Sequence, residues 1–170
     1  VSTGRIMPVH LVGLRRLEYR GYDSCGVAVI EDGRIRRARS VQRVHELIEQ
    51  VENEKIDGTI GIAHTRWATH GKPVVENAHP HIAGGRIALV HNGIIEKYGA
   101  LKERLIAKGY TFASETDTEV LVKLIDSCYQ GEPLQALQAA LSKGRGRYAL
   151  AVLFKDSPDT IFAGNRESPL

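Results

Sequence analysis

The order of apolar and polar residues predicts a helix and then a hairpin near the start of the chain. Over residues 8–19 apolar positions recur three or four apart, which marks one face of a helix. Pro8 suits the first turn of that helix, and Gly21 is expected to end it. Residues 25–30 form a short apolar run typical of a buried strand. The Asp-Gly pair at 32–33 then predicts a tight turn into a return strand.

Capping signals place further helices in the second half of the chain. Thr116 with Glu119 three positions later is a capping box, which predicts the start of a helix. Gly109 is expected to close the helix before it. The other predicted elements are strands at 34–40, 58–63, 86–91, 148–154 and 160–163, helices at 41–51, 100–108 and 133–143, and a polar, histidine-rich loop at 64–81.

The order of these elements indicates one α+β domain. The predicted strands come mostly in hairpin-like pairs with helices grouped after them, which favours α+β layering over a doubly wound parallel sheet. A chain of 170 residues fits a single domain, and it holds no internal repeat or linker. Its apolar fraction of 42% is that of an ordinary globular protein with a sizeable core, so disorder is excluded.

Charge and composition narrow the classes of function. The net charge of +3 is a mild excess. The basic cluster at positions 34, 36, 37 and 39 lies in a predicted exposed strand, and we interpret it as a solvated face. Nucleic-acid binding would require a denser basic stripe. No apolar run approaches the roughly 20 residues that cross a bilayer, and no leader is recognised at the start. Two cysteines without a disulfide framework suit a reducing, cytoplasmic compartment.

The segment at residues 17–24 (LEYRGYDS) lies between the first helix and the buried strand. It is interpretable as a polar loop with Gly21 at the turn. The alternative is that Arg20 and its aromatic neighbours wall a pocket. The residues alone leave both readings open.

A second group of polar residues lies at 64–71 (HTRWATHG) and 77–81 (NAHPH). An arginine fork matches a carboxylate with two hydrogen bonds, so Arg66 indicates a ligand that carries one. The histidines allow a zinc site as an alternative. Their spacing is not that of a metal-binding helix, and Glu76 is the one acidic residue nearby, so ordinary loop histidines are favoured over metal.

Two further features have a structural and a functional interpretation. Asn92-Gly93 predicts a hairpin turn after the strand at 86–91, yet the Asn92 amide and the Gly93 N–H could also form an oxyanion hole. Asp117 lies in the first turn of a capped helix, where the helix dipole favours an acid. It could equally pair with the ammonium group of a ligand.

Taken in order, these motifs resemble one family. The segments at 17–24, 64–71, 91–96 (HNGIIE) and 114–119 (SETDTE) are similar to the glutaminase domain of the glutamine:fructose-6-phosphate aminotransferases (isomerising), the glucosamine-6-phosphate synthases. The resemblance covers essentially the whole chain. Amidophosphoribosyltransferases and asparagine synthetases share the Asn-Gly pair and an arginine loop but not the longer motifs.

The resemblance implies a fold, a reaction and a set of roles. The fold would be that of an N-terminal-nucleophile hydrolase, a four-layer αββα sandwich, and the reaction would be hydrolysis of glutamine to glutamate and ammonia. Arg66 would bind the α-carboxylate and Asp117 the α-ammonium group. No cofactor and no metal are expected. The other implied site residues are Trp67, Thr69 and His70 in the pocket, Asn92 and Gly93 in the oxyanion hole, Arg20 near the nucleophile, and His79 in a less defined role.

One position departs from the family's pattern. The family's nucleophile is a cysteine at the first position of the mature chain, where the free α-amino group acts as its base, whereas position 1 here is Val1. Cys25 and Cys128 are poor substitutes, because both lie inside the chain in apolar stretches. We therefore expect a domain over residues 1–170 that is truncated at both ends, lacks its first strand, binds glutamine weakly at most and does not hydrolyse it.

The expected partners follow from the same resemblance. They are L-glutamine and the sugar-phosphate isomerase domains of the same polypeptide, which are absent from this sequence, in a homo-oligomer when full length. Those domains would use the ammonia to make glucosamine 6-phosphate from fructose 6-phosphate. The alternatives are a non-catalytic glutamine-binding relic and a metal hydrolase that uses the histidine-rich loop.

Overall fold

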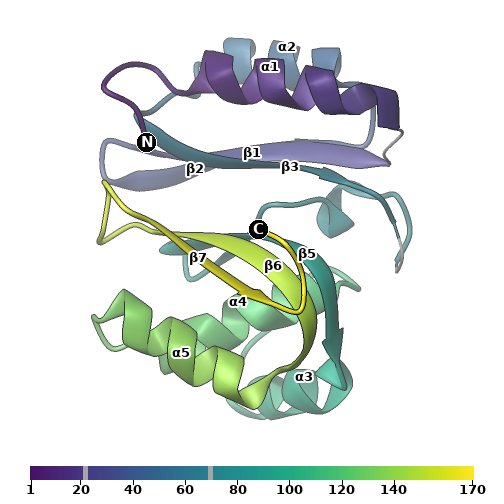
Figure 1. The fold of residues 1–170 in the computed structure, drawn as a ribbon, viewed down its shortest axis with the longest axis vertical. Helices are drawn as coiled ribbons and strands as arrows, with labels where there is room; N and C mark the ends of the chain where they lie inside the picture. Colours follow the sequence, from purple (N-terminus) through teal and green to yellow (C-terminus); the bar gives the residue numbers. More distant parts are fainter. Residues whose placement is uncertain (21–22, 69–70) are drawn as a thin grey trace.

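The structure is a computed structural model that describes residues 1–20, 23–68 and 71–170, with Arg20 described in its backbone alone. Over this part of the chain the strands form two antiparallel sheets, ordered β2-β1-β3 and β4-β5-β6-β7. Helices cover the outer face of each sheet, which gives the four layers seen in Figure 1. The α+β class and the antiparallel pairing are confirmed. The bounds are Met7–Leu17 (α1), Glu18–Arg20 (η1), Ser24–Glu31 (β1), Arg34–Ser40 (β2), Val44–Asn53 (α2), Ile60–Arg66 (β3), Val75–Asn77 (η2), His81–Ala83 (β4), Ile87–Glu96 (β5), Tyr98–Ala107 (α3), Asp117–Cys128 (α4), Pro133–Lys143 (α5), Arg145–Phe154 (β6) and Ile161–Arg166 (β7).

The first sheet is built around β1, which is buried on both faces. Val27 and Val29 pack against the apolar faces of α1 and α2, while Ala28 on the alternate side faces the second sheet. The hairpin into β2 turns at Asp32 and Gly33, whose φ angles are 49° and 72°. Left-handed angles at both positions are those of a type I′ turn, so the predicted hairpin is confirmed.

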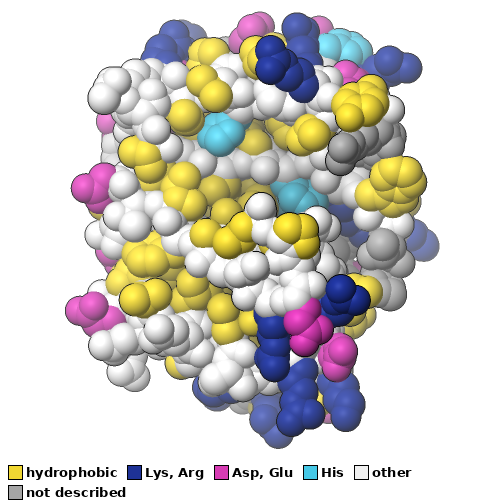
Figure 2. Space-filling model, in the orientation of Figure 1, with side chains coloured by type: hydrophobic (Ala, Val, Ile, Leu, Met, Phe, Trp, Pro, Cys, Tyr) yellow, Lys and Arg dark blue, Asp and Glu magenta, His cyan; other side chains and the backbone are white. Residues whose placement is uncertain are grey.

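The second sheet rests on the long pairing of β5 with β6, which runs from Ile87 opposite Phe154 to Glu96 opposite Arg145. Its outer face packs against α3, α4 and α5 around a core that includes Phe154. Between the sheets lies a smaller apolar cluster. Figure 2 shows apolar side chains gathered over the middle of one face of the molecule, with charged side chains mainly at the margins. Among the described residues, no helix has the length and apolar character needed to cross a membrane.

The ends of the helices follow the predicted capping residues. Gly109, with a φ of 94°, ends α3: its N–H donates to the carbonyl of Ile106 at 2.9 Å, and the N–H of Tyr110 donates to that of Leu105 at 3.0 Å. This pair of bonds is a Schellman motif. At the start of α4 the Thr116 hydroxyl accepts from the N–H of Glu119 at 3.3 Å. Both predicted boundaries are confirmed.

Two predictions for the middle of the chain are wrong in part. The segment at 64–81 is not all loop, since β3 continues to Arg66 and β4 begins at His81. Asn92-Gly93 does not form a turn. Instead β5 continues through this pair to Glu96, and the residues before and after the pair are both paired with β6. The hairpin signal failed because β6 is long enough to bond the whole of β5, and tertiary pairing overrides local turn preference.

The basic cluster of β2 is also more than a solvated face. Arg37 donates to the carbonyl of Pro80 at 3.1 Å, and Arg39 donates to that of Ala78 at 2.8 Å. Burial lowers the pKa of Arg37 to about 10. The two side chains reach across to the segment before β4, so the predicted solvated face is wrong for these residues.

Candidate active site

A cavity of about 480 Å³ opens where β3 ends, beside the middle of β5 and the first turn of α4. This volume lies in the range of about 300–1,000 Å³ typical of small-molecule sites. Segments that are far apart in the sequence thus line one cavity. The lining residues are Leu17, Ala63, His64, Thr65, Arg66, Trp67, His79, His91, Asn92, Gly93, Ile94, Thr116, Asp117 and Thr118.

Arg66 is the last residue of β3 and is only 6% exposed. Its guanidinium Nη1 lies 3.3 Å from Oδ1 of Asp23, and the same atom donates to the carbonyl of Lys72 at 3.4 Å. A buried cation requires such compensation, because its hydration is lost. The fork therefore has a defined position at the cavity wall.

Asp117 is the first residue of α4 and is half-buried. Its Oδ2 atom accepts a hydrogen bond from the N–H of Ile95 at 2.8 Å. That bond ties the start of α4 to the edge of β5 beyond the end of β4. Among the described residues, the cavity is therefore lined by the arginine Arg66 and the carboxylate of Asp117, each fixed by a contact with a neighbouring segment.

Asn92 and Gly93 line the same cavity from β5. The N–H groups of His91 and Ile95 both point to the strand edge opposite β6, toward His79 Nδ1 at 3.4 Å and toward Asp117. Because strand N–H groups alternate in direction, that of Gly93 is directed to the same edge. Gly93 has a φ of 139°, and a Cβ there would collide with the carbonyl oxygen of Arg147. Glycine is therefore required by the backbone.

Four histidines form a packed group at the cavity, and three of them, His64, His79 and His91, line it. The rings of His64 and His79 stack with centroids 4.3 Å apart, and His79 meets His81 edge-on at 5.1 Å. His91 Nδ1 lies 2.9 Å from the hydroxyl of Thr118. Burial, followed by repulsion from His91 and Arg66, lowers the pKa of His64 to about 4. Burial likewise lowers the pKa of His81 to about 3. These rings are neutral at pH 7.

The structure brings together most of the sequence-predicted site residues. Arg66, Trp67, Asn92, Gly93 and Asp117 line the cavity together with His79. Trp67 is 70% exposed at the rim. The predicted residues Thr69 and His70 and the side chain of Arg20 lie outside the described residues.

Sequence reasoning missed other residues of this site. It gave no role to Thr118, which lines the cavity, or to Asn77, which is 1% exposed and bonds to the neighbouring loops. Thr118 follows Asp117 directly at the start of α4, and this adjacency in the sequence is the one signal that could have indicated it. Asn77 begins the polar segment at 77–81, but its bond to Glu115, 38 residues away, gave no signal in the sequence.

The two cysteine thiols and a metal site were the alternative sources of catalytic groups. Cys25 is fully buried beneath α1 and α2, and burial raises the pKa of its thiol to about 12. Cys128 is half-buried at the end of α4 and is not among the residues that line the cavity. Within the described ranges, no group of three or more histidine, cysteine or acidic side chains could hold a metal ion.

A fold of two antiparallel sheets between helices, with a cavity that offers an arginine, a carboxylate and an Asn-Gly pair, matches a known family. The glutamine amidotransferase domain model matches residues 64–169, which is more than half of the chain. The chain belongs to this family and is a class II glutamine amidotransferase domain.

The chain is similar to several glutamine–fructose-6-phosphate aminotransferases. The chain is 51% identical over 175 residues to the glutamine–fructose-6-phosphate aminotransferase (isomerizing) of Bordetella pertussis, covering 100% of this chain and 29% of the relative. It is 52% identical over 164 residues to that of Caldanaerobacter subterraneus, covering 96% and 27%. The chain thus spans less than a third of the length of these relatives.

A solved structure shares the fold at lower identity. The glutamine phosphoribosylpyrophosphate amidotransferase from B. subtilis superposes with a TM-score of 0.73 at 26% identity. The match covers 87% of this chain and 32% of that one.

Proposed function

We propose that this chain is the glutamine-hydrolysing domain of an enzyme that makes glucosamine 6-phosphate from fructose 6-phosphate. The whole-chain identity of 51% to glutamine–fructose-6-phosphate aminotransferases supports the choice of enzyme. The observation that carries the proposal is that Arg66 and Asp117 line one cavity with Asn92 and Gly93. A free amino acid with a side-chain amide presents one carboxylate, one ammonium group and one carbonyl to such a set.

Each group has a proposed task. The Arg66 fork binds the α-carboxylate, because two parallel hydrogen bonds match its shape. Asp117 binds the α-ammonium group through the oxygen that Ile95 leaves free. The Asn92 amide and the Gly93 N–H stabilise the oxyanion that develops when the glutamine amide is attacked. Trp67 and His79 complete the pocket, while Thr69, His70 and Arg20 are assigned from the motifs alone.

The chemistry that we propose is that of an N-terminal-nucleophile hydrolase. A cysteine at the first position of a mature chain would attack the amide, and its own α-amino group would take the thiol proton. The attack forms a thioester acyl-enzyme, and the protonated α-amino group returns its proton to the amide nitrogen, so that the C–N bond breaks and ammonia leaves. Water then hydrolyses the thioester and releases glutamate. A polypeptide of these 170 residues presents Val1 instead, and the Cys25 thiol is buried with a raised pKa. We therefore propose glutamine binding without turnover for this polypeptide.

Calorimetric titration with L-glutamine tests the binding, with Arg66→Lys and Asp117→Asn as variants. Each is expected to weaken binding about tenfold or more, because a charge-assisted bond contributes about 1.5–3 kcal/mol. The control is Asp159→Asn, which changes an exposed carboxylate of the turn before β7. Equal affinity in all four proteins would reject the pocket assignment.

An ammonia assay tests the chemistry. No steady ammonia release is expected from the 170-residue chain in the presence of L-glutamine. Sustained release would reject the proposed need for an added nucleophile. Binding of L-glutamine by a longer protein that begins with cysteine but never releases ammonia would favour a non-catalytic binding domain.

A further inference from the structure

The two charged groups of the proposed pocket are carried by different segments. Arg66 is the last residue of β3, and it is followed along the chain by the segment at 71–77, which ends in η2. Asp117 begins α4 and follows the segment at 113–116. No direct bond between Arg66 and Asp117 is found in the described parts of the chain. Asp23 holds the guanidinium of Arg66, and the N–H of Ile95 holds the carboxylate of Asp117. A contact between the two segments adds a direct constraint on the separation of these two groups.

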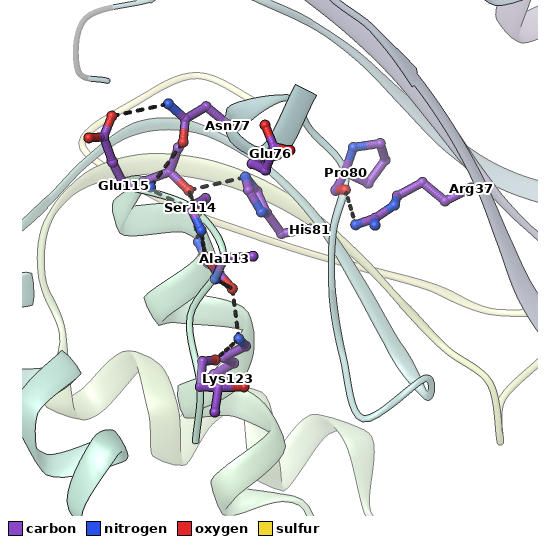
Figure 3. A network of polar contacts seen from close by, with 12 residues as sticks. Arg37, Glu76, Asn77, Pro80, His81, Ala113, Ser114, Glu115 and Lys123 are labelled. Atoms are coloured by element: carbon purple, nitrogen blue, oxygen red, sulfur yellow. Dashed lines mark hydrogen bonds and ion pairs between the residues drawn. The ribbon is translucent and has the colours of Figure 1, made fainter. Parts of the chain in front are cut away.

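Asn77 joins them. Its Oδ1 atom accepts from the N–H of Glu115 at 2.9 Å, and its Nδ2 atom donates to the carbonyl of Lys72 at 2.9 Å. Nδ2 also lies 3.4 Å from Oε2 of Glu115. Figure 3 shows Asn77 and Glu115 facing each other across this junction. One carboxamide thus bonds to both segments through its donor and its acceptor at once.

The bonds of Asn77 extend to Arg66 on one side. The Lys72 carbonyl that accepts from Asn77 also accepts from Nη1 of Arg66 at 3.4 Å. Arg66 and Asn77 therefore share one acceptor. Because Asn77 is only 1% exposed, water is poorly placed to substitute for its bonds. A displacement of Asn77 would move the Lys72 carbonyl and with it the guanidinium.

On the other side the segment that carries Asp117 is held rigidly. The Glu119 carboxylate accepts from the N–H of Ser114 at 2.6 Å and from that of Ala113 at 3.0 Å. The Thr116 hydroxyl lies 3.1 Å from Nε2 of His81. These contacts leave the segment little freedom to deform. The bond between Asn77 and Glu115 therefore joins the loop that carries the Lys72 carbonyl to a rigid segment that leads directly into Asp117.

We propose that Asn77 is a positioning residue that sets the separation between Arg66 and Asp117. It thereby tunes the site to ligands whose carboxylate and ammonium group lie on the same carbon atom, as in an α-amino acid. This inference rests on the proposed function, since it takes these two residues as the ligand contacts. Asn77 itself need not touch the ligand. Because of Asn77, the carboxylate and the ammonium group of one ligand can bind at the same time, and no free energy is lost in rearranging the two segments.

The test compares ligands that carry both groups or only one of them. L-glutamine has both, 4-carbamoylbutanoate lacks the ammonium group, and 4-aminobutanamide lacks the carboxylate. Titrations use the unmodified chain and Asn77→Asp, which keeps the shape but places an oxygen where Nδ2 donated. The matched control is Asn165→Asp, because Asn165 Nδ2 likewise donates to a backbone carbonyl, that of Ser168 at 2.8 Å, and Asn165 is not among the residues that line the cavity.

Asn77→Asp is expected to weaken L-glutamine binding about tenfold or more, and binding of each one-group ligand by less than about threefold. A role in stability alone would weaken all three ligands by the same factor. Asn165→Asp should leave all three affinities unchanged. Should Asn77→Asp fail to fold, Glu115→Ala removes the weaker contact with Nδ2 and is expected to give the same pattern at smaller size.

The two proposals fail in different ways. If the unmodified chain binds L-glutamine and Asn77→Asp binds it equally well, or loses all three ligands equally, the positioning role is overturned while the proposed function stands. If the unmodified chain does not bind L-glutamine, the proposed function falls, and the positioning role falls with it. A loss confined to L-glutamine supports both.

Discussion

Asp23 and Arg66 are joined by two contacts that run in opposite directions. The N–H of Asp23 donates to the carbonyl of Arg66 at 2.9 Å, and Nη1 of Arg66 lies 3.3 Å from Oδ1 of Asp23. Ser24 also donates its hydroxyl to that carboxylate at 2.9 Å. The pairing fixes the guanidinium at the end of β3, where the proposed ligand carboxylate binds.

Asp23→Asn should therefore affect both stability and binding. Loss of the negative charge leaves the buried guanidinium with weaker compensation, so the free energy of unfolding should fall by about 1–3 kcal/mol. L-glutamine affinity should fall as well, because the fork is less well oriented. Urea denaturation and calorimetric titration measure the two effects, with Asp159→Asn as the exposed control. Unchanged stability and affinity would show that the pair does not orient Arg66.

Gly93→Ala should be strongly destabilising. The φ of 139° is strained for alanine, and the new Cβ would collide with the Arg147 carbonyl, so we expect a loss of about 2–5 kcal/mol. Gly99→Ala is the matched control, because that glycine lies in α3 and an added Cβ there would meet no atom within 4 Å. It should raise the stability by up to about 1 kcal/mol. Thermal melts of both variants measure the difference, and equal melting temperatures would contradict the geometry of β5.

How far the sequence could predict this structure depended on the range of the interactions involved. The turn at Asp32-Gly33, the end of α3 at Gly109 and the start of α4 at Thr116 were predictable, because each depends on backbone angles or bonds within a few residues. The path of Asn92-Gly93 through β5 was not, because it depends on pairing with β6 more than 50 residues away. Asn77 was missed for the same reason, since its partner Glu115 is 38 residues away.

The buried histidines should make the fold less stable as the pH falls. In the unfolded chain histidine has a pKa of about 6.5, whereas burial lowers the pKa to about 4 for His64 and to about 3 for His81. Between these values the unfolded chain binds protons that the folded chain does not. The stabilisation is therefore complete above about pH 6.5 and is lost as the pH falls, by about 1.4 kcal/mol per unit for each histidine.

Urea denaturation between about pH 7.5 and pH 5 measures this slope. His81→Gln should flatten it, while replacement of the exposed His45 by Gln should leave it unchanged. The same slope in His81→Gln as in the unmodified chain would contradict the assignment.

Cys25 should be inert toward thiol reagents in the folded chain. Its thiol is inaccessible and its pKa is raised to about 12, whereas the thiolate is the reactive species. Iodoacetamide labelling followed by peptide mass spectrometry should find Cys128 modified first, with Cys25 modified after unfolding in urea. Labelling of Cys25 at the same rate in folded and unfolded chain would restore it as a candidate nucleophile.

The most direct test of the proposed pocket is amide chemical-shift mapping of the 170-residue chain during titration with L-glutamine. Binding in this cavity should give saturable shifts at Gly93, Ile94 and Asp117, with none on the outer faces of α2 and α5, and no such shifts when D-glutamine replaces the L-isomer. An absence of shifts at these residues at saturating L-glutamine, or shifts confined to a distant surface, would contradict the claim that this cavity binds both ends of the amino acid.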